Sequence, residues 1–416
     1  MNALYDAGIA LYATAARTLG ALREGKARQM TRGQRESIEK IRKARERDAP
    51  EGFDLWVHAA SLGEFEQGRP LIEWLKRERP EAKVLLTFFS PSGYEVRKDW
   101  GGADCVAYLP FDTRKNARRV VEAAAAKRAV FVKYEFWGNY IEALKAAGTP
   151  TYLISAIFRP GQAFFKPWGG MMRRILRGYT HIYVQDERSA ALLRGIGVEN
   201  AEVAGDTRFD RVAEVRRSAR RVEALERALE GSTLTLVAGS TWEPDEKIVA
   251  AWLKRHPEAR AVVAPHEIGE ERLRSIERLM EEARTVRLSR LQASGDADAA
   301  PRVVIVDCFG LLSSLYHYGD IAYVGGGYGA GIHNVNEAAA HGVATVFGPR
   351  HEKFKEAADL MALGGGFDRP EEALEMLAAD GEARRRAGEA AGRYISENVG
   401  ATERIYSGLW GSGKLD

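Results

Sequence analysis

The chain has 416 residues, of which 45% are hydrophobic and 29% charged, and its net charge is +3. This composition excludes disordered and collagen-like chains and is typical of a soluble α/β protein with two domains. The two cysteines, Cys105 and Cys308, form no close pair, so a reducing, cytoplasmic setting fits and no cysteine zinc site is predicted. The eight histidines show no metal-binding spacing, so we expect no protein-held metal. No nucleic-acid partner is predicted.

Residues 1–48 are predicted to form a separate N-terminal segment. Leu4–Leu22 is apolar, but its charged residues leave a run too short to span a bilayer. From Arg17 to Arg47 there are eleven basic and four acidic residues, so the positive charge of the chain is local. An apolar helix followed by a basic segment is typical of a helix lying on an anionic membrane surface. The alternative is a helix that packs on the protein body and carries a solvated basic flank.

Residues 49–215 alternate between apolar runs and helical segments, which predicts a parallel sheet with helices on both faces. The predicted strands are Leu55–Ala60, Lys83–Phe88, Val106–Leu109, Ala129–Lys133, Thr151–Ile154 and His181–Gln185. A turn at Ser61–Gly63 and a helix over Glu64–Arg79 follow the first strand, with Pro70 expected in the first turns of that helix. Ser90–Gly93 follows the second strand, and its hydroxyls and amides either cap the next helix or hold an anion.

A charged helical stretch at Arg211–Gly231 interrupts this rhythm, and we place a domain boundary within it, between residues 215 and 216. Residues 216–395 repeat the pattern, and 396–416 are predicted to form a helical tail. A turn is expected at Gly239–Thr241 and a surface loop at Ala293–Pro301. The predicted strands are Thr233–Ala238, Ala261–Ala264 and Val303–Val306.

The second domain is organised around Ile321–Pro349, which reads as strand, glycine loop, short helix and strand. Gly325, Gly326 and Gly327 let the backbone turn sharply and approach a ligand, and the free N–H groups of the following helix favour an anion such as a phosphate. Asn334 and Glu337 share a helical face and can reach a sugar hydroxyl beside it. The alternative is a tight α/β connection without a ligand.

Two doubly wound domains place their ligands outside the carboxyl ends of their strands, so we expect the two sets of loops to face each other across a cleft. The candidates in the first domain are Ser61, Gly63, Glu64, Ser90, Ser92, Gly93 and Glu135. In the second they are Ser240, Thr241, His266 and the glycine loop with its helix. Glu64, at a helix start, is expected to be ionised and ready to accept a proton, or else to be an ordinary first-turn acid.

Five motifs together resemble the 3-deoxy-D-manno-octulosonic acid (Kdo) transferases of lipopolysaccharide synthesis, in the order of that family and over nearly the whole chain. They are HAASLGE at 58–64, GDTRFD at 205–210, GST at 239–241, PH at 265–266, and VGGGYGAGIHNVNEAA from Val324 through GP at 348–349.

The resemblance implies a GT-B fold, in which the second domain binds a CMP-Kdo donor and the first accepts a lipid A precursor (lipid IVA). It implies an inverting glycosyltransferase attached, peripherally or monotopically, to the cytoplasmic face of the bacterial inner membrane. Glu64 stands where the family has the acid of its Ser-Val-Gly-Glu motif, which implies that Glu64 is the general base.

Several positions depart from the family pattern and indicate a divergent branch. Lys133–Asn139 (KYEFWGN) replaces Glu-Thr-Glu-Leu-Trp-Pro-Asn, and Ser155–Arg159 (SAIFR) replaces Asn-Ala-Arg-Leu-Ser. The Arg of Pro-Arg-His is missing before His266, Leu311 replaces an acid, and Arg208 replaces Lys. We expect these changes to bear on the details of the acceptor and on the number of sugars added more than on the donor.

Transfer to a hydroxyl requires a base and stabilisation of the departing CMP phosphate, which helix amides and basic side chains can supply without a metal. Arg208 is the candidate partner of that phosphate or of the Kdo carboxylate, and a surface arginine is the alternative. One rival function is a GT-B transferase with a nucleoside diphosphate sugar donor, as in lipid A disaccharide synthase or a heptosyltransferase. Another is a non-catalytic sugar- or lipid-binding protein at the membrane surface.

Overall fold

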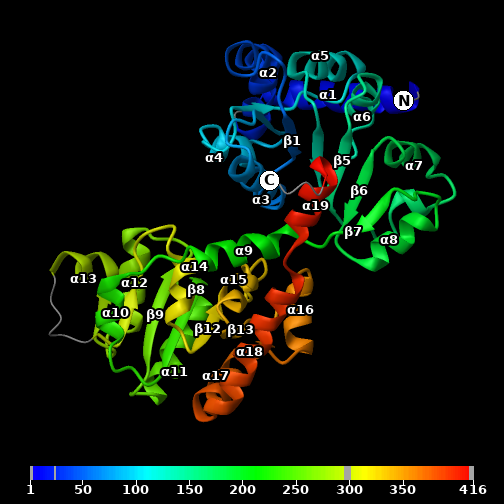
Figure 1. The fold of residues 1–416 in the computed structure, drawn as a ribbon. Coiled ribbons are helices and arrows are strands. Elements are labelled where there is room, and N and C mark those ends of the chain that lie inside the picture. The colour runs from blue at the N-terminus through cyan, green and yellow to red at the C-terminus, as the bar shows by residue number, and fades with distance from the viewer. Residues whose placement is uncertain (1–2, 23–24, 295–300, 412–416) are drawn as a thin grey trace. The chain divides into compact units, whose positions relative to one another are not determined.

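The computed structural model describes residues 3–22, 25–294 and 301–411, and the chain divides into two compact units. The first unit consists of Met1–Arg211 with Val399–Asp416, and the second of Val212–Asn398. Each unit contains one sheet flanked by helices (Figure 1). The predicted boundary at 215/216 lies inside a helix, and most of the loop predicted at Ala293–Pro301 lies outside the described residues.

The sheet of the first unit has seven strands among the described residues, and all neighbouring strands are parallel. Their order is β3-β2-β1-β4-β5-β6-β7. The strands are β1 (Leu55–Ala59), β2 (Val84–Phe88), β3 (Cys105–Tyr108), β4 (Ala129–Val132), β5 (Thr151–Ala156), β6 (His181–Val184) and β7 (Ala201–Val203). The helices of this part of the chain are α1 (Ala3–Leu22), α2 (Lys26–Asp48), α3 (Leu62–Glu78), α4 (Pro91–Arg97), α5 (Arg114–Ala124), α6 (Gly138–Ala146), η1 (Ala163–Phe165), α7 (Gly170–Leu176), α8 (Glu187–Arg194) and α9 (Thr207–Arg217).

Alternation along these strands divides the core of the first unit into two faces. Trp56 and Leu85 belong to one hydrophobic cluster, and the residues that follow them, Val57 and Leu86, belong to another. Successive residues of a strand point to opposite faces, so a strand that is apolar throughout must be covered on both sides. The apolar runs of the sequence therefore become the buried strands of a doubly covered parallel sheet.

The second unit repeats this architecture with a seven-stranded parallel sheet, counted over the described part of the chain, in the order β10-β11-β9-β8-β12-β13-β14. Its strands are β8 (Thr235–Thr241), β9 (Arg260–Pro265), β10 (Thr285–Arg287), β11 (Val303–Ile305), β12 (Ile321–Val324), β13 (Ala344–Phe347) and β14 (Gly366–Phe367). Its helices are α10 (Glu223–Leu229), α11 (Glu243–Arg255), α12 (Glu270–Leu279), α13 (Leu288–Ser294), α14 (Leu312–Leu315), η2 (Tyr316–Tyr318), α15 (Val335–Ala340), α16 (Lys355–Ala362), α17 (Pro370–Ala379) and α18 (Gly381–Asn398). The predicted fold class of two doubly wound α/β units is confirmed.

Two local predictions are wrong. Gly239–Thr241, predicted as a turn, continues β8, because Gly239 pairs with Val324 of β12 and Thr241 with Pro265 of β9. Pro70, expected in the first turns of its helix, lies in the middle of α3, where it cannot donate the usual helical hydrogen bond.

The last helix, α19 (Ala401–Trp410), returns to the first unit. The carboxylate of Asp210 accepts hydrogen bonds from the backbone N–H groups of Gly400 and Thr402 and from the Thr402 hydroxyl, at 2.5–2.7 Å. Ile405 and Leu409 of α19 are buried in the same hydrophobic cluster as Val57. The C-terminal helix is therefore part of the core of the first unit.

The two N-terminal helices also pack on the first unit. α2 buries Ile38 and Ile41 in the cluster that contains Trp56. α1 is fixed at its first turn, where the Tyr5 hydroxyl donates to Asp112 at 2.5 Å. No helix within the described residues is both long and apolar enough to cross a membrane.

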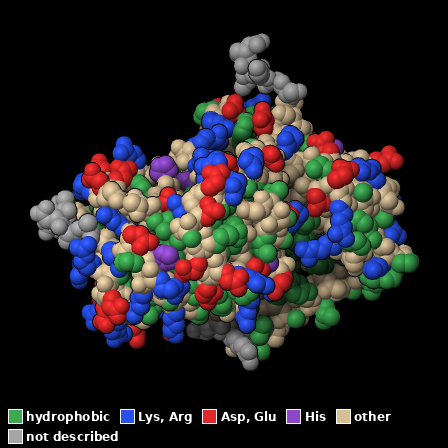
Figure 2. Space-filling view, turned by 90° about the horizontal axis from the view of Figure 1, so that it is seen from below, with side chains coloured by type: hydrophobic (Ala, Val, Ile, Leu, Met, Phe, Trp, Pro, Cys, Tyr) green, Lys and Arg blue, Asp and Glu red, His purple; other side chains and the backbone are tan. Residues whose placement is uncertain are grey.

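Acidic and basic side chains are interspersed over the face shown in Figure 2. Ion pairs between residues four apart on one helix contribute to such a pattern, as between Glu243 and Lys247, whose charged atoms are 2.6 Å apart. Exposed pairs of this kind add little stability, so burial of the sheets, and not surface charge, holds each unit together.

Asp112 provides a pH-dependent test of the docking of α1. It is fully buried and accepts hydrogen bonds from Tyr5 and from the backbone N–H groups of Asn139 and Tyr140. Burial raises the pKa of Asp112 to about 6, and these hydrogen bonds oppose that rise. Between about pH 4 and pH 6 the folded chain keeps this proton while the unfolded chain has lost it, so stability falls as the pH rises.

We therefore expect the free energy of unfolding of the first unit to lose up to about 3 kcal/mol over this interval, relative to Asp112→Asn. Urea unfolding of both proteins at several pH values measures the difference. Parallel pH profiles would show that Asp112 does not titrate in this range.

Candidate functional site

In both sheets the order of the strands reverses beside the first strand. β1 lies between β2 and β4, and β8 lies between β9 and β12. Ligands of open parallel sheets bind outside the carboxyl ends of the strands at such a point, because the loops on its two sides diverge. The residues that follow β1 and β4, and those that follow β8 and β12, therefore form one candidate site in each unit.

Glu64 lies in the first turn of α3, directly after β1. The preceding Ser61 is the N-cap residue of this helix, and its hydroxyl donates to the Glu64 carboxylate. Glu64 is partly exposed, and a Cβ added at Gly63 would meet only the Ser61 hydroxyl within 4 Å. The carboxylate is therefore accessible at a helix start, which stabilises negative charge, and it can accept a proton from a bound hydroxyl.

Tyr134, in the loop after β4, lies within electrostatic reach of Glu64 and two arginines. Burial raises the pKa of the Tyr134 phenol, the charges of Arg159 and Arg208 oppose this rise, and the charge of Glu64 adds to it. Lys133 has a φ of 68°, in the left-handed region that non-glycine residues rarely adopt, and its ammonium lies 5.4 Å from the centre of the Tyr134 ring. Tyr134 and Arg159 were not predicted as site residues, although both stand in segments that depart from the family pattern.

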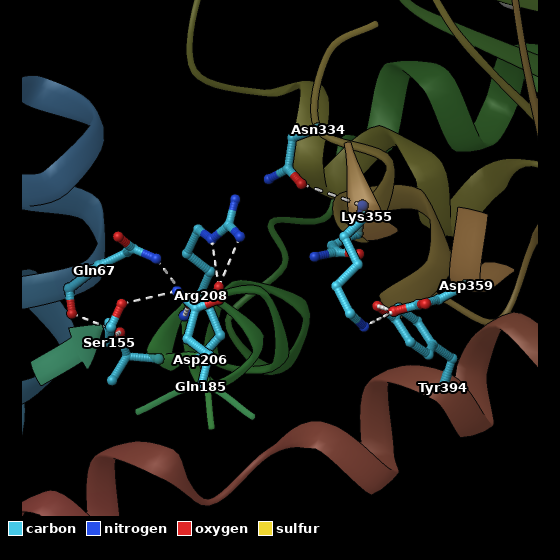
Figure 3. Close-up of polar contacts among 11 residues, drawn as sticks. Gln67, Ser155, Gln185, Asp206, Arg208, Asn334, Lys355, Asp359 and Tyr394 are labelled. Carbon is cyan, nitrogen blue, oxygen red and sulfur yellow. Dashed lines mark hydrogen bonds and ion pairs between the residues drawn. The ribbon is translucent and has the colours of Figure 1, made fainter. Parts of the chain in front are cut away.

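Arg208 is oriented by a buried carboxylate. Asp206, 5% exposed, accepts hydrogen bonds from Nε and a terminal nitrogen of Arg208, at 2.9 and 2.7 Å. It also accepts one from the side-chain amide of Gln67 in α3, at 3.1 Å. Figure 3 shows these residues beside Ser155, whose hydroxyl lies 3.0 Å from that of Thr207. The guanidinium is therefore held at the strand ends of the first unit, with a side chain that is 39% exposed.

Glu135 lies in a different environment from the one expected of a substrate-binding acid. It is 6% exposed, and its carboxylate accepts a hydrogen bond from Trp137 and lies 3.0 Å from Nε2 of the buried His58. The other ring nitrogen of His58 lies 3.0 Å from the hydroxyl of Thr87. Glu135 thus belongs to a polar network inside the first unit, and Glu64 is the more accessible of the two acids.

Ser90, Ser92 and Gly93 begin the next helix. The Ser90 hydroxyl caps α4 by accepting a hydrogen bond from the Ser92 backbone at 3.2 Å. A Cβ added at Gly93 would come within 2.2 Å of Phe88, so this glycine is needed for close packing. In the structure Ser90 therefore caps the helix and Gly93 packs against Phe88.

The candidate site of the second unit begins at the end of β8. Ser240 has a φ of 54°, and the Thr241 hydroxyl donates to Glu246 at 3.0 Å. Trp242 then stacks on His266, with ring centres 4.7 Å apart, and His266 stacks on His333 at 4.6 Å. The three rings come from the ends of β8 and β9 and from the loop after β12, so the fold assembles an aromatic surface from three separate segments.

The glycine loop after β12 is closely packed against the backbone. A Cβ at Gly325 would lie 2.4 Å from the Ser240 carbonyl oxygen, and one at Gly327 would lie 2.5 Å from Gly348. Gly326 has a φ of +96° and donates its N–H to the buried carboxylate of Asp245 at 3.0 Å. Steric contact therefore requires these glycines at the first and third positions, and backbone conformation requires one at the second.

Asn334 and Glu337 lie together at the start of α15. The Asn334 oxygen accepts a hydrogen bond from the Asn336 backbone at 3.2 Å, and its amide donates to Glu337 at 3.1 Å. Ser313 donates to the other oxygen of Glu337 at 2.8 Å. α15 has only six residues, so its dipole contributes less to anion binding than the dipole of a long helix would.

Figure 3 also shows an ion pair on α16, between Lys355 and Asp359.

Within the described residues, no group of three or more His, Cys, Asp or Glu side chains is arranged to hold a metal ion. The polar groups available to a ligand in the two units are therefore carboxylates, hydroxyls, arginines, imidazoles and backbone amides.

Comparison with known proteins relates the chain to one group of enzymes. A family model described as 3-deoxy-D-manno-octulosonic-acid transferase (kdotransferase) matches residues 25–211. The chain is 29% identical over 388 residues to the 3-deoxy-D-manno-octulosonic acid transferase of Bordetella pertussis, which covers 87% of this chain and 88% of that one. It is 26% identical over 322 residues to the corresponding protein of Aquifex aeolicus, which covers 76% of this chain and 81% of the relative.

Solved structures with the same fold are more distant in sequence. UDP-GlcNAc 2-epimerase from Neisseria meningitidis, bound to UDP-GlcNAc, gives a TM-score of 0.60 at 14% identity, over 86% of this chain and 99% of that one. MurG from Acinetobacter baumannii gives 0.54 at 12% identity, over 86% and 99%. At these identities the likeness concerns the fold alone.

The carboxylate of Asp245 provides a test of how the glycine loop is held. It is 1% exposed and accepts hydrogen bonds from the backbone of Trp242 and Gly326 and from the Tyr323 hydroxyl, at 2.9–3.0 Å. Asp245→Asn replaces an acceptor by a donor, so we expect the second unit to lose about 1–3 kcal/mol of stability and the Gly326 amide to exchange faster with solvent. Glu243→Gln, in the exposed first turn of the same helix, is the matched control and should change stability by less than about 0.5 kcal/mol. Equal effects of the two substitutions would mean that Asp245 does not hold the loop.

Proposed function

We propose that this chain, a GT-B glycosyltransferase and a divergent relative of the Kdo transferases, transfers Kdo from CMP-Kdo to a lipid A precursor, with Glu64 as the general base. The observation that carries the proposal is the position of Glu64: an accessible carboxylate in the first turn of α3, beside the switch point of the first sheet, in a chain similar to Kdo transferases over most of its length. A carboxylate at that point can deprotonate an acceptor hydroxyl.

The proposed reaction is a single displacement. The acceptor oxygen attacks the anomeric carbon of Kdo while its proton passes to the Glu64 carboxylate. A new carbon–oxygen bond forms as the bond between that carbon and the CMP phosphate breaks, and CMP leaves with the electron pair. Attack opposite the leaving group inverts the anomeric configuration. The Ser61 hydroxyl, which donates to Glu64, orients the carboxylate before the acceptor binds.

Arg208 supplies positive charge in this proposal. Its hydrogen bonds to Asp206 fix the guanidinium plane and leave part of the side chain exposed to an anionic substrate group. A fixed guanidinium can stabilise either the departing phosphate or the carboxylate of Kdo without reorganising during the reaction. We propose that the transfer is independent of metal ions for this reason.

The donor is proposed to bind the second unit. The glycine loop lets a phosphate approach the backbone closely, and Asn334 and Glu337 offer an amide and a carboxylate to the ribose. Ser240 and Thr241 lie beside the loop, and the stacked rings of Trp242, His266 and His333 offer an aromatic face to the cytosine. Burial and the neighbouring His266 lower the pKa of His333, so this ring enters the site uncharged at neutral pH.

We propose that the first unit binds the acceptor and contacts the membrane. Lys133 and Arg159 lie near Tyr134 and suit an anionic acceptor such as a phosphorylated lipid. On α1, Leu4, Leu11 and Leu22 are 79%, 74% and 77% exposed, and the basic α2 follows. This arrangement is typical of a helix at an anionic bilayer surface, and we propose attachment to the cytoplasmic face of the inner membrane through it.

The donor site is tested by calorimetry with CMP. Asn334→Ala and Glu337→Ala each remove a polar contact proposed for the ribose, so each should weaken CMP binding by about 10-fold. Asp359→Ala, on α16, is a control that should bind CMP normally, and UDP should bind more weakly than CMP to the unaltered chain. Unchanged CMP affinity in both variants would move the donor away from α15, and preference for UDP would favour a nucleoside diphosphate sugar.

The base is tested by Glu64→Gln, which keeps the size of the side chain but cannot take a proton. Turnover of CMP-Kdo with a tetra-acylated lipid A precursor, followed by mass spectrometry of the product, should fall by about 10²-fold or more, while CMP affinity stays near that of the unaltered chain.

Two controls accompany this variant. Glu66→Gln changes an acid of the same helix that pairs with Arg97 at 3.1 Å, and it should retain activity. Glu135→Gln probes the buried acid. Activity in Glu64→Gln with loss in Glu135→Gln would transfer the role of base to Glu135, and activity in both would refute the single-carboxylate mechanism.

A further inference from the structure

A hollow of about 590 Å³ lies between α6 and α7 on the first unit. Its lining combines the apolar side chains of Ile141, Met171 and Ile175 with basic ones. Gly178 lets the chain approach closely here, since a Cβ at that position would lie 2.4 Å from Ile141. The hollow is therefore an apolar depression between two helices, with charged groups at its edge.

The basic residues of the lining are Lys145, Arg174 and Arg177, and the one acid that the lining contains is Glu142. The side chains of Lys145 and Arg174 are exposed and have no hydrogen-bond or ion-pair partner among the described residues. Arg177 donates to the carbonyl oxygen of Ile196 at 3.2 Å. Unpaired cations above an apolar floor complement a ligand that has a negative head and an apolar body.

An exposed tryptophan stands next to this hollow. Trp168 is 72% exposed, two residues before the start of α7. The loop that carries it is held by hydrogen bonds: the guanidinium of Arg173 donates to the carbonyl oxygens of Phe164 and Lys166, both at 3.0 Å. Phe164 in turn is buried. A tryptophan held out on a braced loop is suited to the interface between membrane and water, where one edge of the indole is apolar and the other is wet.

The helix that forms one wall of the hollow, α6, is hydrogen-bonded to the first turn of α1. Gly138, part of its lining, donates its N–H to the Tyr5 hydroxyl at 3.0 Å, and the neighbouring Asn139 donates to Asp6 at 3.0 Å. A second hollow of about 880 Å³, between α5 and α6, shares Glu142 and Lys145 with the first. The N-terminal end of α1 lies beside α6 in Figure 1, with α7 beyond it. The start of α1 and the hollow are therefore neighbours on the first unit.

We propose that the hollow between α6 and α7 binds the headgroup of an anionic glycerophospholipid through Lys145 and Arg174, while Trp168 enters the interfacial layer of the bilayer. This contact is separate from α1 and from Glu64. It gives the first unit a second point of attachment, which fixes its orientation on the membrane as well as its presence there. The proposal rests on the membrane location proposed above but not on Kdo transfer.

The test uses the full chain and co-sedimentation with phosphatidylcholine vesicles that contain or lack phosphatidylglycerol. Each basic residue near an anionic surface contributes about 1 kcal/mol, so the double variant Lys145→Gln/Arg174→Gln should lower the partition coefficient by about 10- to 30-fold on anionic vesicles only. Arg77→Gln/Lys98→Gln removes two exposed charges, one from α3 and one from the residue after α4, that line neither hollow, and this variant should bind nearly as the unaltered chain does. Equal losses in both double variants would overturn the proposal, because they would show a response to net charge alone.

A second measurement locates the tryptophan. Vesicles with brominated acyl chains quench tryptophans that enter the bilayer, so the unaltered chain should be quenched and Trp168→Phe should lose most of that quenching. Replacement of Leu4, Leu11 and Leu22 by Ser weakens the contact through α1 and should leave the difference between the unaltered chain and Trp168→Phe in place. Quenching that survives in Trp168→Phe and disappears with the leucines would overturn the proposal in favour of α1 alone.

Three controls separate this proposal from its alternatives. Calorimetry with soluble dihexanoyl phosphatidylglycerol should detect binding that the Lys145→Gln/Arg174→Gln variant lacks, and unchanged binding would overturn the proposal. CMP affinity should be the same in this variant, and Glu64→Gln should bind vesicles normally, so failure of the transfer reaction is distinguishable from failure of the lipid site. If sedimentation velocity shows dimers that this variant loses while vesicle binding is unchanged, the hollow is a contact between two copies and the proposal is wrong.

Discussion

All strands of a parallel sheet end at one edge, and in each unit the chain reverses direction across the sheet beside its first strand, β1 or β8. The loops on the two sides of that strand must diverge, so the opening between them is a consequence of chain connectivity. Glu64 and Tyr134 follow the two strands that border one opening, and Trp242 and the glycine loop follow those that border the other. Glu64 and the glycine loop owe their positions to this constraint, whereas Arg208 follows β7 at the edge of the first sheet.

Buried carboxylates hold several side chains and backbone groups in place through hydrogen bonds. Asp206 holds Arg208, Asp245 holds Gly326, and Asp112 holds Tyr5, in each case with two or more further hydrogen bonds. A carboxylate inside a protein is costly unless donors surround it, and its removal leaves those donors unpaired. The three acids therefore connect segments that are distant in sequence.

Sequence alone predicted the parts of the molecule that depend on local pattern. Apolar runs such as those of β1 and β2 are recognisable as strands from the sequence alone. The motif around Gly325–Gly327 is confirmed as strand, loop, helix and strand. The edge strands β7, β10 and β14 have only two or three residues, too few for a periodic signal, and were missed. The burial of individual acids could not be predicted from the sequence either. No local sequence feature distinguishes Glu135, which is enclosed by His58 and Trp137, from the accessible Glu64. The pairing of Arg208 with Asp206 and the electrostatic reach of Tyr134 depend on tertiary contacts in the same way.

The return of α19 to the first unit has a consequence for synthesis. Ile405 and Leu409 complete a hydrophobic cluster whose other members, including Val57 and Leu86, lie far earlier in the chain. A ribosome makes the whole of Val212–Asn398 before it makes these two residues. The second unit is therefore an insertion that can fold while the first is still missing part of its core, and the unit that starts first is the one completed last.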